Sequence, residues 1–216
     1  MRNYPQGFVF TGLNNPQYGG ASGGNIAVYF AGRLQGRQNF NLFAVDTQSG
    51  RVTQITTGIA DDRNPTLSPT DAGNPFRLVL AFDSNRSNPA GTATKATRDI
   101  WVVPVNAFPA TAATRVTNFS VGGTSSNNIE PAWSTNKIDE VNGPQSFVNG
   151  RQLIAFASTR RDSANDGNAD SINPNGTSDI YWLEATVGPD AGNPGSYTVL
   201  TPESALNAAR KLPTSD

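Results

Sequence analysis

The residue types that most often perform chemistry in proteins are missing from this chain. It has 216 residues, with no His and no Cys. A Ser-His-Asp triad, a Cys nucleophile, a disulfide and a zinc site with nitrogen or sulfur ligands are therefore excluded. The remaining carboxylates, hydroxyls, Arg and Lys form no nucleophile elbow, phosphate-binding loop or paired-carboxylate motif. We therefore expect a protein that is not an enzyme.

One stretch has the residue types of a metal site. Residues 162–170 combine oxygen-bearing side chains with an Asp-Gly turn, and a hard cation such as Ca²⁺ prefers oxygen ligands. The spacing differs from the EF-hand loop, because Ala164 stands where a ligand is expected. The alternative is a solvated loop in which Asn, Asp and Gly form turns. Calcium is the one cofactor that the sequence suggests, and its candidate ligands are Asp162, Asn165, Asp166 and Asp170.

Charged pairs are a second candidate. Arg86 with Asp99, and Arg160 with Asp179, flank two long insertions between apolar runs. Each Arg is expected to bridge to its Asp and to fix the base of a hairpin, a contribution of about 0 to 1 kcal/mol if exposed. A charged ring at one mouth of the fold is the functional alternative.

Aromatic side chains are a third candidate. Trp101, Trp133, Tyr181 and Trp182 could form a platform for a carbohydrate or a peptide, but core packing is the expected role because they recur at repeated positions. If one of them is exposed, we expect it to be Trp182, since alternation along a strand points it away from Tyr181.

Charge and hydropathy exclude two classes of partner. The chain carries 16 Lys and Arg against 17 Asp and Glu, and this net charge of -1 argues against nucleic acid as a partner. No stretch approaches the roughly 18 apolar residues of a membrane span, and the first residues contain no signal peptide.

The elements that must position these residues form a repeat. Its first part is a polar residue, a Pro, a small or polar residue and a large apolar one. Three copies are present: Asn15-Pro16-Gln17-Tyr18, Asn64-Pro65-Thr66-Leu67 and Glu130-Pro131-Ala132-Trp133. Each copy is followed by an apolar run that is typical of a strand buried on both faces. The runs occupy residues 26–31, 78–84 and 153–158, and they are followed by Arg33, Arg86 and Arg160.

Two more strands are expected in each unit. The third strands are residues 41–46, 99–104 and 179–184, and the shorter fourth strands are residues 52–56, 114–117 and 197–201. Four short strands that recur three times predict an all-β fold, a β-propeller of four-stranded antiparallel blades. The blades would span residues 15–57, 64–118 and 130–202 of one domain covering residues 1–216. Residues 8–11 are interpreted as one extra strand of a preceding blade.

The order of these elements resembles the PD40 (WD40-like) repeat of TolB-like β-propellers. Residues 130–201 carry the fullest copy, while the Ser-Pro-Asp-Gly turn of the family is altered at Ser68 and Ser134. The pectate-degrading lyases among TolB-like proteins depend on His, so the absence of His argues against that activity. The resemblance implies a scaffold in the periplasm, outside the cell or at the cell surface.

About three blades would leave a ring open, since propellers have roughly 4 to 8 blades. We therefore expect an oligomer, a protein partner or part of a larger chain to complete the fold. The expected function is a non-catalytic scaffold for protein–protein interaction or assembly. The alternative is an accessory propeller domain of a larger enzyme, such as a serine peptidase, whose catalytic domain lies outside this chain.

Overall fold

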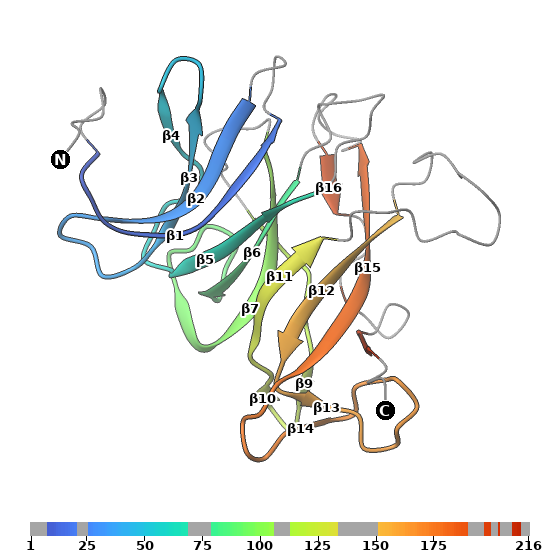
Figure 1. The fold of residues 1–216 in the computed structure, drawn as a ribbon. Coiled ribbons are helices and arrows are strands. Elements are labelled where there is room, and N and C mark those ends of the chain that lie inside the picture. The colour runs from blue at the N-terminus through green and yellow to red at the C-terminus, as the bar shows by residue number, and fades with distance from the viewer. Residues whose placement is uncertain are drawn as a thin grey trace, which may run out of the picture.

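The fold is all-β in the computed structural model, which describes residues 8–20, 26–68, 79–105, 113–133, 151–189, 197–199, 203 and 209–212. Those residues contain no helix, and so none that could cross a membrane. Three antiparallel sheets follow one another along the chain (Figure 1). The first sheet contains β1 (Phe10–Gly20), β2 (Ile26–Leu34), β3 (Asn41–Asp46) and β4 (Val52–Gln54). The second contains β5 (Asp62–Leu67), β6 (Val79–Arg86), β7 (Thr94–Pro104) and β8 (Thr114–Arg115).

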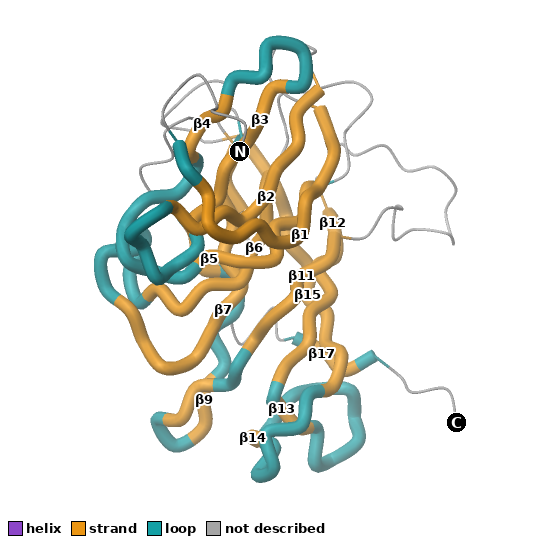
Figure 2. Tube along the Cα trace, turned by 60° about the vertical axis from the view of Figure 1, so that its left-hand side comes forward, coloured by secondary structure: helices purple, strands orange, loops and turns teal. Residues whose placement is uncertain are grey.

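The third sheet has one strand more than the other two. It contains β11 (Asn128–Trp133), β12 (Arg151–Ser158), β15 (Asp179–Pro189), β16 (Tyr197–Val199) and β17 (Arg210–Lys211). Two short ribbons complete the described strands: β9 (Ser120–Val121) with β10 (Thr124–Ser125), and β13 (Arg160–Arg161) with β14 (Ser171–Ile172). Both ribbons lie at one end of the molecule (Figure 2).

The three sheets share one register. The aromatic residue of each second strand pairs with that of the third strand, as Phe30 with Phe43, Phe82 with Trp101, and Phe156 with Tyr181. The outer strand then pairs at the same place: Phe43 with Gln54, Trp101 with Arg115 and Tyr181 with Lys211. The three sheets are therefore copies of one unit.

The last of these pairings corrects the fourth strand predicted for the third unit. Residues 197–199 do form β16, but it pairs with Val187, Gly188 and Pro189, beyond the part of β15 that pairs with β12. β17 holds the position of β4 and β8, so the third unit continues to residue 212. Residues 8–11 also differ from their prediction, because Phe10 and Thr11 belong to β1, where Phe10 pairs with Leu34 of β2.

The repeated Pro motif forms a bulge in each first strand. Asn15, Asn64 and Glu130, the residues before the three Pro, have φ values of 42°, 50° and 55°. The pairing register shifts at each of these places. A Pro has no N–H to donate to the ladder, so the chain turns away from its neighbour at this point and then rejoins it.

Two apolar cores hold the sheets together. One lies between the first and second sheets and includes Leu42, Ile55, Phe82 and Trp101. The other lies between the second and third sheets and includes Ile100, Val116, Phe156 and Tyr181. The second sheet is therefore buried on both faces, as predicted, whereas the first and third sheets are each covered by the second sheet on one face.

Candidate functional site

The predicted calcium ligands lie between β13 and β14, on an exposed loop. The Asp162 carboxylate accepts backbone hydrogen bonds from Asp166 (3.2 Å) and Gly167 (2.7 Å). The chain turns through Asn165, whose φ is 55°. Asp170 Oδ1 accepts a hydrogen bond from the Ser163 backbone N–H at 3.0 Å, and this bond holds the pKa of Asp170 below its usual value.

These contacts account for the loop without an ion. The carboxylates of Asp162, Asp166 and Asp170 each accept backbone hydrogen bonds from within the loop. In the described part of the chain, no three acidic side chains converge on one point as a metal site would require. The calcium hypothesis therefore rests on the sequence alone.

The two buried Arg pair with other acids than those predicted. Arg86 bridges to Asp62 (2.6 Å), the residue that begins β5, and both are almost completely buried. Arg160, which is fully buried, pairs with Glu203 through both terminal nitrogens. The predicted partners bind elsewhere, Asp99 to Lys95, Arg115, Thr117 and Asn128, and Asp179 to Lys211. Arg33 does not occupy the position of Arg86. Gly32 of the first sheet corresponds to Ser84 of the second, since Gly32 pairs with Leu13 as Ser84 pairs with Asp62. Arg33 is one residue after this position, whereas Arg86 is two residues after it.

The replacement of one residue explains why Arg160 does not pair with the first strand of its own unit, as Arg86 does. Asn128 pairs with Ser158 as Asp62 pairs with Ser84, so an amide replaces the carboxylate there. The Asn128 Nδ2 donates to Asp99 at 2.9 Å, a contact that a second carboxylate would turn into repulsion. Glu203 supplies the missing charge.

A polar chain connects the bulges of the three sheets. Asn15 donates to Asn64 (2.6 Å), which donates to Asp83 (2.7 Å), and Asp83 also accepts from the Glu130 backbone N–H (3.2 Å). Arg98 bonds the other oxygen of Asp83. Burial raises the pKa of Asp83, and the Arg98 guanidinium opposes that rise. Every one of these groups has a partner, so the chain of contacts is structural.

The aromatic residues follow the prediction. Trp101, Trp133 and Tyr181 are buried, and burial raises the pKa of Tyr181 to about 12. Trp182 is half-buried and points to the opposite face of β15, where the guanidinium of Arg210 lies 5.9 Å from its ring centre. Trp182 is therefore the accessible member of the set.

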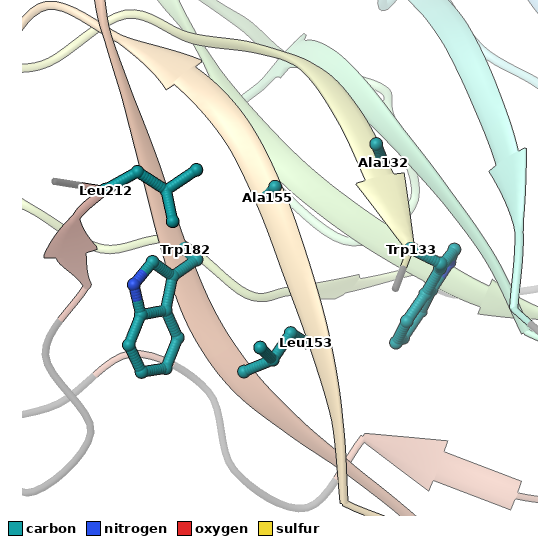
Figure 3. Close-up of a pocket in the computed structure, with 6 residues that line it drawn as sticks. All are labelled: Ala132, Trp133, Leu153, Ala155, Trp182 and Leu212. Atoms are coloured by element: carbon teal, nitrogen blue, oxygen red, sulfur yellow. The ribbon is translucent and has the colours of Figure 1, made fainter. Parts of the chain in front are cut away.

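Trp182 lines an apolar hollow on the third sheet, on the face opposite the second sheet. The hollow encloses about 400 Å³. Figure 3 shows Trp182, Leu153 and Leu212 around the small side chain of Ala155. It is lined by Ala132, Trp133, Leu153, Ala155, Trp182 and Leu212.

Ile180 extends this apolar surface along β15, so that Ala132, Leu153, Ala155, Ile180, Trp182 and Leu212 together form the open face of the third sheet. Ile180 is 48% exposed and Leu212 is 41% exposed. The same positions of the other sheets are buried. Ile180 corresponds to Leu42 and Ile100, and Leu212 corresponds to Ile55 and Val116; all four are 0% exposed.

The correspondence follows from the backbone bonds. The N–H of Ile55, Val116 and Leu212 donates to the carbonyl of Leu42, Ile100 and Ile180, respectively. The first and second sheets bury this face against the next sheet, and within the described residues no further sheet covers the third.

Sequence reasoning found Trp182 but missed Ile180 and Leu212. Ile180 lies in the predicted third strand, where only the aromatic residues were considered as surface candidates, and residue 212 fell outside the predicted third unit. The signal that could have found them was the position of Ile180 two residues before Trp182, on the same side of a strand.

Comparison of the chain with models of known protein families, and with the sequences of curated proteins, gives no match.

Proposed function

We propose that this chain is a non-catalytic β-propeller scaffold of the TolB-like kind, and that it assembles with other protein through the open face of its third sheet. Three antiparallel meanders in one register support the interpretation of each sheet as a propeller blade. The resemblance of the repeats to TolB-like sequences supports a place in the periplasm, at the cell surface or outside the cell.

The exposure of the open face carries the proposal. Ile180 and Leu212 face solvent at positions that the first and second sheets bury completely. Full burial of an exposed Leu or Ile side chain is worth about 1.5 to 3 kcal/mol, so each of these half-exposed side chains contributes about half of that to an assembly. A contiguous apolar surface on a soluble chain marks an interaction site more often than a lone exposed side chain does.

The experiment places a charge on this face and measures the mass in solution. Ile180→Asp adds a carboxylate where the side chain already contacts water, so the chain should still fold. The matched control is Val121→Asp, at an exposed apolar position (39%) on β9. By multi-angle light scattering we expect a defined oligomer for the unaltered chain and for V121D, and the 22.8 kDa monomer for I180D.

Two other results would count against assembly. A folded monomer of the unaltered chain at every concentration would contradict the proposal. Aggregation without a defined mass would favour the alternative, an accessory propeller domain of a larger enzyme with further chain beyond these residues.

A further inference from the structure

We propose that the open face of the third sheet binds the aromatic face of the first sheet of a second copy of this chain, and that two copies close one ring of six sheets. This inference rests on the proposed function, and it adds the identity of the partner and the surface that it uses.

The two internal contacts between sheets follow one rule. At the first contact, Leu42 and Ile55 of the first sheet share a core with Phe82 and Trp101 of the second. At the second contact, the corresponding Ile100 and Val116 share a core with Phe156 and Tyr181 of the third sheet. At both contacts the earlier sheet therefore contributes an aliphatic pair and the later sheet an aromatic pair, and the first sheet adds Tyr29 to its side of the first contact.

The first sheet presents the aromatic kind of face outward. Phe30 and Phe43 hold the positions of Phe82 with Trp101 and of Phe156 with Tyr181. Phe8 and Phe10 pack over Phe43, with ring centres 5.5 Å and 4.9 Å from that of Phe43, which is completely buried. The outward surface is therefore formed by the half-buried rings of Phe8, Phe10 and Phe30.

One row of this face is open. Tyr18, Val28 and Val45 pair across the first sheet, and Tyr18 is 69% exposed while the two Val are half-buried. The side chains of the same row in the third sheet are buried, each at most 7% exposed. That row consists of Trp133, Ile154 and Leu183.

The third sheet presents the matching kind of face. Ala155 and Trp182 pair across it, where the first sheet pairs Tyr29 with Ala44. Each pair combines one large aromatic residue with Ala, so the two pairs have a similar total volume. The aromatic residue lies on the second strand in the first sheet and on the third strand in the third sheet. The open face can therefore meet an aromatic partner face as the inner face of the first sheet does.

The number of sheets favours two copies. A contact between unlike surfaces builds a ring where the rotation closes and a filament where it does not. Two chains of three sheets give six, which lies within the roughly 4 to 8 blades of known propellers, whereas three chains would exceed that range.

The test uses two variants of the full chain, Ile180→Asp on the open face and Tyr18→Asp on the aromatic face. Both side chains are exposed in the single chain, so both variants should fold, which circular dichroism would check. Each variant alone carries one altered residue in both contacts of the ring. At one protein concentration, we expect sedimentation equilibrium to give a dimer for the unaltered chain and for Val121→Asp, but monomers for I180D and for Y18D.

Mixing the variants identifies the geometry. In a heterodimer of I180D with Y18D, one contact carries both changes and the other is unaltered. One buried carboxylate already breaks a contact, so a second change in the same contact adds little. The heterodimer thus keeps one intact contact where either variant alone keeps none, and we expect the mixture to associate at least roughly tenfold more tightly than either variant alone.

Three results would overturn the inference. If I180D is monomeric and Y18D remains a dimer, the open faces bind each other, so the inference fails while the proposed function survives. A mass that grows without limit would replace the ring by a filament. A monomeric unaltered chain would overturn both the inference and the proposed function.

Discussion

Among the described residues with positive φ, Glu130 is the one that is neither Gly nor Asn. It holds a left-handed conformation, with φ 55°, at a bulge where the other two sheets place Asn15 and Asn64. Asn tolerates this region better than most residues, because its short polar side chain bonds locally. Glu130 is exposed, and only its backbone N–H joins the polar chain of the bulges.

Replacing Glu130 should therefore stabilise the protein. We expect Glu130→Asn and Glu130→Gly to raise the free energy of unfolding by about 1 kcal/mol, as measured in urea, because they relieve the left-handed strain. Glu130→Gln removes the same charge without relieving the strain, and it should change stability little. Equal gains from all three variants would show that charge, and not backbone conformation, is the cause.

Glu203 binds both the second and the third sheet. Its backbone N–H donates to Val116 O (2.7 Å), and its carboxylate accepts from the Asn118 N–H and pairs with Arg160. Arg160 is enclosed by the rings of Phe119, Phe156 and Tyr181, 5.0 to 6.0 Å away. The ion pair thus joins Arg160, just after β12 of the third sheet, to a residue that also bonds Val116 and Asn118, which follow the last strand of the second sheet.

Loss of this pair should be costly. We expect Glu203→Gln to lower the free energy of unfolding by about 3 to 5 kcal/mol, because it leaves a guanidinium buried without its counterion. Glu130→Gln, which removes an exposed carboxylate, is the matched control. A loss below about 1 kcal/mol in urea unfolding would mean that Arg160 finds another acceptor or reaches water.

The elements were more predictable than their contacts. The apolar runs at 26–31, 78–84 and 153–158 correctly marked β2, β6 and β12, because short runs of β-branched and aromatic residues favour strands. The burial on both faces that was predicted for all three runs holds only for β6 of the second sheet. The two-residue strand β17 carries no pattern of its own and depends on its bonds to β15. The partners of Arg86 and Arg160 were mispredicted because they come from before the unit and from residue 203, so sequence proximity gave no guide.

At the scale of the whole molecule, the sequence could predict three repeated units but not which of their faces would be covered. All three units carry apolar residues on both sides of their strands, and only the stacking order decides the outcome. The second sheet buries both faces, whereas Ile180 and Leu212 of the third sheet remain open. The proposed assembly follows from this difference between chemically similar faces.

Hydroxyl-radical footprinting with mass spectrometry tests this claim most directly, since it labels side chains in proportion to their exposure. Ile180 and Leu212 are 48% and 41% exposed in the single chain, and Ile59, in the connection between the first two sheets, is 56% exposed. In the unaltered protein in solution, we expect strong labelling of Ile59 and protection of Ile180 and Leu212. Labelling of Ile180 and Leu212 as strong as that of Ile59 would contradict the proposed assembly.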